Sequence, residues 1–284
     1  MITVGYDGSS RTGRAVEWAA LEATMRNATV QLVTCFGGPP KLGWPDEAPP
    51  ELAGPRRNVA DVVDQALARC RDRHPTIRFD ANVVYGLPEE RLAAEAKGSD
   101  LLVVGTTGHG FLDAWRLGAV SHNVARHAPC PVVLVPASAA SAIHNRVVVA
   151  VDGSDTSNLA LTWAADEADR RQTELVVVHV WSYPYPVGEH GLARDLIQVD
   201  ASLIVQDAAR RARDRTGRTV TELMLEGSTW SELVAQTARA DLLVIGSRGQ
   251  NAVRSLLFGS VAHHVSAHAS CPVAVVHAQN NTTP

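Results

Sequence analysis

A group of glycines near the carboxyl end of the chain has a spacing suited to phosphate binding. Two residues separate Gly246 from Gly249, nine separate Gly249 from Gly259, and Ser260 follows. The early glycines let the backbone turn tightly and approach a ligand closely. The last glycine and the serine open a predicted helix, whose unpaired N–H groups and dipole favour an anion. The spacing is neither that of a dinucleotide-type glycine cluster nor that of a Walker loop ending in Gly-Lys.

The same glycine pattern occurs earlier in the chain. Gly105 and Gly108 are followed, after nine residues, by Gly118 and Ala119. The two loops differ at one position that bears on chemistry, because Ala119 stands where the later loop has a serine.

An acidic residue is duplicated together with the glycine loops. Val-Gly-Tyr-Asp7-Gly-Ser near the start matches Val-Ala-Val-Asp152-Gly-Ser in the second half. A repeat this long indicates two copies of a whole domain and not a solenoid. We expect domains at residues 1–138 and 146–278, joined by a short linker of small and polar residues.

Length and composition fit two globular domains and narrow the classes of function. The 284 residues are enough for two domains that each bury a core. A net charge of −4 gives no reason to expect nucleic acid or an anionic membrane as a partner. The first residues lack the features of a signal peptide, and no apolar run approaches the ~18 residues of a membrane-spanning helix. We therefore expect a cytoplasmic protein.

Each copy shows alternating strand and helix patterns. Continuous apolar runs such as 147–151 and 175–178 are typical of parallel strands covered on both faces. The alternation predicts an α/β fold with an open, doubly wound sheet in each copy. Such sheets bind ligands beyond the carboxyl ends of their strands, where the strand order reverses. The acidic residue and the glycine loop would share that crevice if the first and fourth strands were neighbours.

Each aspartate also has a plainer interpretation, as the cap of the helix that follows it. In a binding role, it would accept hydrogen bonds from ribose hydroxyls or help to hold a metal on the phosphates. The repeated pairing of Asp7 and Asp152 with a glycine loop favours binding.

With these motifs the chain resembles a tandem universal stress protein, a family that carries G-x2-G-x9-G-(S/T) as its ATP-binding signature. The resemblance covers both copies nearly end to end. It implies, for each copy, a five-stranded parallel sheet in the order 3-2-1-4-5, flanked by helices. For the cofactor it implies ATP, with Mg²⁺.

The resemblance also implies which residues would contact ATP. Asp7 and Asp152 would lie near ribose and phosphates, and the backbone at Cys35 and Val180 would meet adenine. In the first copy the phosphate contacts would be Gly105, Gly108, Gly118, Ala119 and Val120. In the second copy they would be Gly246, Gly249, Gly259, Ser260 and Val261.

The second loop matches the signature more fully than the first. The hydroxyl missing at Ala119 removes one hydrogen bond to a charged group, worth about 1.5–3 kcal/mol. The second loop also carries Arg248, where the first has Thr107. We predict that the second site binds ATP more tightly.

The leading hypothesis is a regulatory stress-response protein whose ATP-bound state changes its interactions with partners. A slow ATPase or a phosphoryl- or nucleotidyl-transfer enzyme is the alternative, but neither loop contains a lysine and no general base is evident. We assign no catalytic residue. In the family the final strands, here 132–135 and 273–276, commonly mediate dimer pairing. They could form a pseudo-dimer within the chain, which we expect to form a homodimer.

Other residues have simpler interpretations. His264 and His268 have the spacing of two metal ligands on a helix, but surface histidines are favoured because no acidic residue supports them. His179 is expected to be a hydrogen-bonded structural residue. The four cysteines include no Cys-x-x-Cys pair and are expected to be small, mostly buried thiols. Residues 37–55 hold six of the fifteen prolines and are expected to be irregular.

Overall fold

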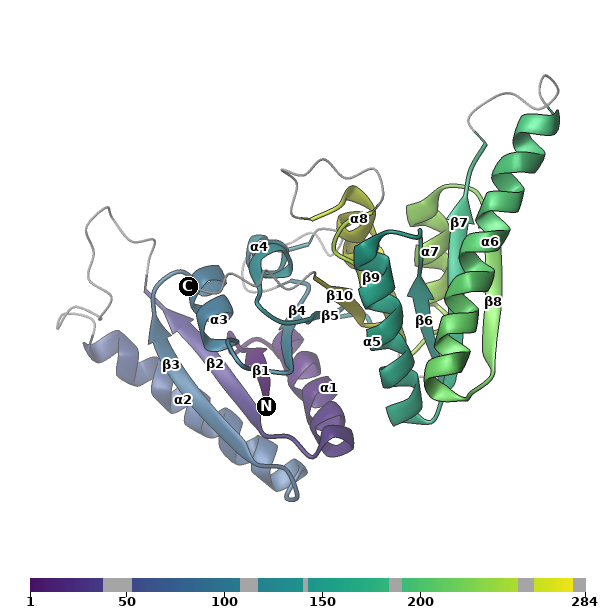
Figure 1. Cartoon of the computed structure of the whole chain (residues 1–284). Helices are drawn as coiled ribbons and strands as arrows, with labels where there is room; N and C mark the ends of the chain where they lie inside the picture. The colour runs from purple at the N-terminus through teal and green to yellow at the C-terminus, as the bar shows by residue number, and fades with distance from the viewer. Residues whose placement is uncertain (38–52, 108–116, 140–142, 184–190, 250–257, 278–284) are drawn as a thin grey trace, which may run out of the picture. The chain divides into compact units, whose positions relative to one another are not determined.

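The computed structural model describes residues 1–37, 53–107, 117–139, 143–183, 191–249 and 258–277 (Figure 1). The chain divides into two compact units, Met1–Ala137 and Ser138–Ala278. Each unit is an α/β domain built on five parallel strands.

The first unit alternates strands and helices from its first residues. Its strands are β1 (Ile2–Gly5), β2 (Val30–Phe36), β3 (Phe79–Tyr85), β4 (Leu101–Gly105) and β5 (Val132–Val135). Its helices are α1 (Ser10–Arg26), α2 (Ala53–Arg73), α3 (Pro88–Glu95) and α4 (Ala119–His127). The strands are parallel, in the order β3-β2-β1-β4-β5. Helices α3 and α4 pack against each other in front of the sheet, whereas α2 lies behind it (Figure 1).

The second unit repeats this arrangement. Its strands are β6 (Arg146–Ala150), β7 (Glu174–Trp181), β8 (Val220–Glu226), β9 (Leu242–Gly246) and β10 (Val273–Val276). Its helices are α5 (Asp155–Arg171), α6 (Gly191–Thr216), α7 (Thr229–Thr237) and α8 (Ser260–His268). The parallel order is β8-β7-β6-β9-β10. The predicted fold class and the 3-2-1-4-5 strand order are confirmed in both units.

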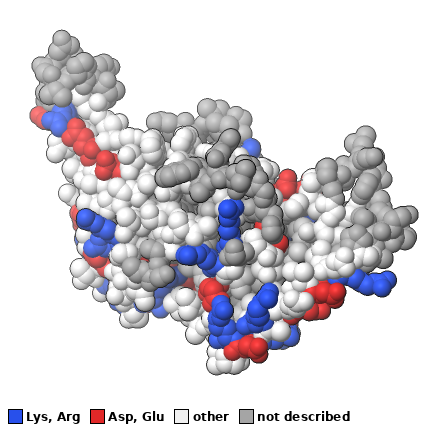
Figure 2. All heavy atoms as spheres, turned by 180° about the vertical axis from the view of Figure 1, so that it is seen from behind, with Lys and Arg blue, Asp and Glu red and all other residues white. Residues whose placement is uncertain are grey.

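The central strands form the core, as their apolar sequences predicted. All residues of β1 and β4 are buried, as are residues 242–245 of β9. Burial of whole strands follows from helices covering both faces of a parallel sheet. Charged side chains of both signs are interspersed over the face shown in Figure 2. No helix in the described ranges is long and apolar enough to cross a membrane.

Two helix boundaries differ from the sequence prediction. Helix α2 begins at Ala53, so the expected irregular segment ends earlier, and Pro55 lies in the first helical turn. Proline is tolerated there because first-turn N–H groups have no intrahelical partner. The sequence pattern predicts a helix over residues 195–216, and helix α6 begins four residues earlier, at Gly191. The remainder of the proline-rich segment, residues 38–52, lies outside the described residues.

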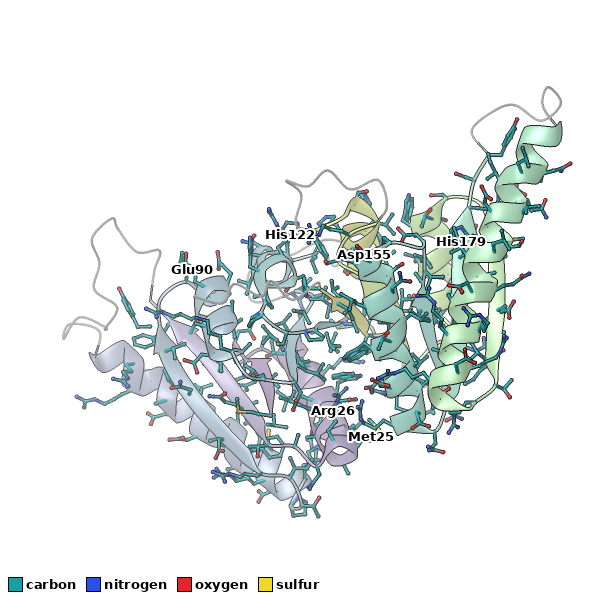
Figure 3. The ribbon with its side chains drawn as sticks, in the orientation of Figure 1. Met25, Arg26, Glu90, His122, Asp155 and His179 are labelled. Carbon is teal, nitrogen blue, oxygen red and sulfur yellow. The ribbon has the colours of Figure 1, made fainter. Side chains whose placement is uncertain are left out.

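Each unit buries one glutamate completely on the helix that follows its first strand. Glu22 on α1 and Glu167 on α5 have no exposed surface. Arg26 pairs with Glu22, and Arg170 and Arg171 pair with Glu167. Figure 3 labels Arg26 near the end of α1. A buried carboxylate is tolerated only because a cation and hydrogen bonds compensate for its lost hydration.

Replacing Arg26 therefore tests how strongly the first unit depends on this pair. The variant Arg26→Ala is expected to lower the free energy of unfolding by about 3 kcal/mol, because it removes a cation that pairs with a buried carboxylate. Urea denaturation followed by circular dichroism measures this. Arg78→Ala removes the exposed pair with Asp80 and should cost less than about 1 kcal/mol. Similar losses of unfolding free energy for both variants would contradict a special stabilising role of the buried pair.

Candidate nucleotide-binding site

The turn after β1 is organised by the carboxylate of Asp7. Its Oδ1 accepts hydrogen bonds from the Ser9 N–H and from the Thr12 hydroxyl, both at 2.9 Å. The cap of α1 is Ser9, whose hydroxyl accepts from the Thr12 N–H at 3.3 Å. The helix-cap interpretation therefore applies to the serine, and the aspartate shapes the turn that leads from the strand to the helix.

The second unit repeats this turn. Asp152 Oδ1 accepts from the Ser154 N–H at 3.0 Å, and Ser154 caps α5 by accepting from the Ser157 N–H. Asp7 is exposed and Asp152 is half-buried. Both carboxylates thus lie at the carboxyl edge of their sheets, beside the first strand.

A side chain of the neighbouring strand fixes each of these strand exits. The Thr34 hydroxyl donates to the Tyr6 carbonyl oxygen at 2.8 Å. In the second unit His179 Nδ1 lies 2.7 Å from the Val151 carbonyl oxygen, and Figure 3 labels this histidine on β7. Since a carbonyl can only accept, Nδ1 carries the proton. His179 thus has the structural hydrogen bond that was expected of it.

In the first unit a cavity of about 330 Å³ brings the predicted residues together. Six of them line it: Asp7, Cys35, Gly105, Gly118, Ala119 and Val120. The cavity lies between the exits of β1, β2 and β4 and the first turns of α3 and α4. Gly108 lies outside the described residues.

The α4 end of this cavity is suited to an anion. Gly118 is the N-cap residue of α4, with no side-chain capping bond, and its own N–H donates to the Thr106 carbonyl at 2.8 Å. The N–H groups of the first helical turn have no intrahelical acceptors. Two residues of that turn, Ala119 and Val120, line the cavity. The Ser121 hydroxyl donates to the Gly105 carbonyl at 2.6 Å and so ties the helix start to β4.

The β2 end of the cavity is apolar and uncharged. Val33 on β2 and Leu92 on α3 line it beside Cys35. Burial raises the pKa of the Cys35 thiol to about 12, so the thiol is protonated at neutral pH. The cavity therefore combines an apolar wall, a carboxylate and a helix N-terminus.

In the second unit the glycine loop packs closely against the start of α5. A Cβ added at Gly249 would lie 2.7 Å from Asp152 Oδ2, and one at Gly246 would lie 2.9 Å from the backbone carbon of Thr156. The Thr156 hydroxyl donates to the Arg248 carbonyl at 2.6 Å. Protein packing alone therefore favours glycine at position 246, where the neighbour is backbone, whereas a side chain at position 249 would displace the Asp152 carboxylate.

The remaining predicted residues of the second unit lie on the elements expected. Gly259 is the N-cap residue of α8, makes no side-chain capping bond, and donates its N–H to the Ser247 carbonyl at 2.8 Å. Ser260 and Val261 open α8, and Val180 is half-buried near the end of β7. The structure thus brings Asp152 next to Gly249, and it leaves the first turn of α8 uncapped by a side chain.

Sequence reasoning missed several residues of these sites. Thr12, Leu92 and Ser121 line the cavity of the first unit. A hydroxyl two residues after Ala119 could have pointed to Ser121. The duplication did not point to Thr156, because the matching residue of the first copy is Arg11.

The paired histidines of α8 lie within hydrogen-bonding distance of backbone carbonyls of their own helix. Nδ1 of His264 lies 2.7 Å from the Ser260 carbonyl oxygen, and Nδ1 of His268 lies 2.8 Å from the His264 carbonyl oxygen. Both rings lie beside Trp230, at centroid distances of 5.9 and 6.2 Å. No group of three or more metal-ligating side chains occurs in the part of the chain that the structure describes.

Comparison with known proteins agrees with this fold. The sequence model of the Universal stress protein family matches residues 1–136 and again residues 144–277. The chain is 32% identical over 285 residues to universal stress protein Rv2005c of Mycobacterium tuberculosis, covering 96% of each protein. It is 31% identical to universal stress protein Rv2623 of the same organism, covering 96% of this chain and 95% of that one. A universal stress protein structure from Archaeoglobus fulgidus matches with a TM-score of 0.70 at 18% identity, over 97% of this chain and 98% of the other.

The tandem fold, with a crevice at the exits of the first and fourth strands, defines the class of doubly wound α/β domains. Within that class, two observations identify the family. The family model matches both halves of the chain, and relatives above 30% identity cover nearly all of it. The chain belongs to the universal stress protein family, a family of stress-response proteins, and contains two family domains in tandem.

The glycine environments predict different tolerances in the two loops. Gly246→Ala should destabilise the second unit by about 1–3 kcal/mol, because the new methyl group would press on the α5 backbone. Gly105→Ala should cost less than about 1 kcal/mol, since the nearest atom would lie 3.6 Å from its methyl group. Thermal unfolding of both variants checks this, and equal shifts would contradict it.

Proposed function

We propose that the protein binds ATP at the carboxyl edge of each sheet, and that its nucleotide state modulates interactions with partners during stress adaptation. The observation that carries the proposal is the cavity of the first unit, in which Asp7, Cys35 and the start of α4 come together.

The chemistry of this cavity suits a molecule with a flat apolar end and an anionic end. Its volume of about 330 Å³ falls within the ~300–1,000 Å³ typical of ligand pockets. The wall formed by Val33, Cys35 and Leu92 would take adenine, and the N–H groups of Ala119 and Val120 would take phosphates. Asp7 would lie between these ends, near the ribose.

An exposed carboxylate beside a triphosphate needs a reason, because the two charges repel. Asp7 and Asp152 can accept hydrogen bonds from ribose hydroxyls, or each can supply an oxygen to the Mg²⁺ that ATP carries. Mg²⁺ is usually held by one or two carboxylates together with substrate phosphates, so a larger cluster of protein ligands is not needed. When bound, Mg²⁺ would neutralise phosphate charge.

The tighter binding of the second site stays a prediction. It rests on Ser260, whose hydroxyl has no counterpart at Ala119, and on Arg248 in the loop that Thr156 holds. Gly246→Ala is a poor probe of this ranking, because it would disturb packing as well as phosphate contacts.

The proposal describes a regulator and assigns no catalytic residue. A slow ATPase is the alternative, and ADP release over hours in the presence of magnesium separates the two. We also propose that the protein acts in the cytoplasm as a homodimer, which cell fractionation and light scattering of the purified chain can check.

Protection of Cys35 tests the proposed ligand in the first unit. With N-ethylmaleimide at pH 8, saturating ATP should slow alkylation of Cys35 at least about tenfold, because the nucleotide would cover its thiol. Burial raises the pKa of Cys35 to about 12, so only a small fraction of the thiol is ionised at that pH and labelling is slow enough to follow. Peptide mass spectrometry reads both rates.

Cys70 on α2 is the internal control, since it does not line the cavity. Its labelling rate should not respond to ATP. If Cys35 were labelled equally fast with and without millimolar ATP, the nucleotide would not occupy this cavity.

A further inference from the structure

Helix α6 carries an apolar seam on its solvent face. Leu196, Val199 and Leu203 are 59%, 53% and 57% exposed, and their spacing of three and four residues places them on one side of the helix. The opposite side is buried against the second unit and consists of Ala201, Val205, Ala208, Ala209 and Ala212. The seam therefore makes no contribution to the core of its own unit.

The fold itself does not require this seam. The equivalent helix α2 presents Gly54, Arg57 and Asp61 at the matching exposed positions. The two helices are aligned by their buried residues and by one arginine in each. Arg71 and Arg213 both donate a hydrogen bond to the carbonyl of the first residue of the next strand. Three exposed apolar residues within eight positions of one helix are unusual for a surface that only faces water.

The flanks of the seam are acidic. Asp195 and Asp200 are exposed on either side of it, and in the described part of the chain neither takes part in an ion pair. The adjacent Arg194 is engaged elsewhere: it pairs with Glu226 at 2.7 Å and lies over the Trp181 ring at 5.8 Å. The seam is thus bordered by negative charge that no neighbouring arginine neutralises.

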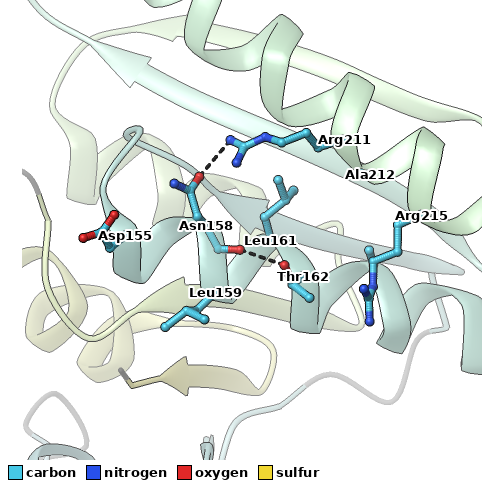
Figure 4. Close-up of a pocket in the computed structure, with 9 residues that line it drawn as sticks. Asp155, Asn158, Leu159, Leu161, Thr162, Arg211, Ala212 and Arg215 are labelled. Carbon is cyan, nitrogen blue, oxygen red and sulfur yellow. Dashed lines mark hydrogen bonds between the residues drawn. The ribbon is translucent and has the colours of Figure 1, made fainter. Parts of the chain in front are cut away.

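The seam continues into a groove between α5 and α6. Leu203 lines a hollow of about 350 Å³ together with Ile204, Ala208 and Gly153. A second hollow of about 360 Å³, shown in Figure 4, adjoins it and includes Leu159, which is 43% exposed.

The two hollows share Asn158 and Arg211. A hydrogen bond of 2.8 Å from the Arg211 guanidinium to the Asn158 side chain crosses the groove between them (Figure 4). An apolar side chain of a partner could enter the groove on either side of this bond.

We propose that this seam and groove dock an amphipathic helix of a partner protein, with apolar residues three and four positions apart and Lys or Arg beside them. Helices bind apolar grooves through such spacing, and flanking charges select the partner. A second copy of this chain would place acidic flank against acidic flank, so charge complementarity favours a basic partner. The inference does not depend on the proposed ATP sites.

Two synthetic three-heptad helical peptides with the same leucine seam, one flanked by lysines and one by glutamates, serve as probes. Fluorescence anisotropy with the full chain should show at least about tenfold tighter binding of the lysine peptide. The double variant Asp195→Lys/Asp200→Lys should reverse the preference. The variant Leu196→Ser/Leu203→Ser should weaken binding of the lysine peptide at least about tenfold.

A matched control makes the same charge change elsewhere. Asp61→Lys/Asp64→Lys on the exposed face of α2 should leave the preference unchanged, because these residues lie in the other unit.

Equal binding of both peptides, or equal effects of the two lysine double variants, would overturn the proposal. A dimer in light scattering that Leu196→Ser/Leu203→Ser dissolves would assign the seam to a second copy and also overturn it. If Asp195→Lys/Asp200→Lys fails to fold, Asp195→Asn/Asp200→Asn, which should lower the preference, replaces it.

Discussion

The pairing of the first strand with the fourth is the constraint on which each candidate site depends. β1 pairs with β4 through Ile2–Leu101 and Val4–Val103, and β6 pairs with β9 in the same register. At this place the strand order reverses, so the two strand exits open side by side. Asp7 and Gly105 consequently line one cavity, although almost a hundred residues separate them in the sequence.

The duplicated fold does not make the two halves equivalent. The second loop is tied to α5 by the Thr156 hydroxyl, where the first copy has Arg11. Ser260 opens α8, whereas Ala119 opens α4. The apolar seam of α6 has no counterpart at the matching positions of α2, which are Gly54, Arg57 and Asp61. The framework has been retained in both copies while loops and outer helix faces have diverged.

The architecture could be predicted because strand and helix patterns alternate regularly along the sequence and recur in its second half. Apolar strands such as β9 and the repeated motifs were visible along the chain, and the resemblance supplied the strand order. The contact of Thr156 with Arg248, which shapes the second site, follows no periodic pattern and was missed. The buried carboxylates of Glu22 and Glu167, which belong to the core, were missed for the same reason. Gly246 and Gly249 were assigned to phosphate contacts, and the structure adds a packing reason that only three-dimensional neighbours could reveal.

The most direct test of the central claim is calorimetric titration with ATP and magnesium, after prebound nucleotide has been removed. The variants Asp7→Asn and Asp152→Asn keep the Oδ1 that accepts the turn's hydrogen bonds and remove only the charge. We predict two sites in the wild-type chain, at least about tenfold weaker binding at one site in each single variant, and the same weakening at both sites in the double variant. Unchanged titrations in the double variant, or no binding by the wild-type chain at millimolar ATP, would contradict the account.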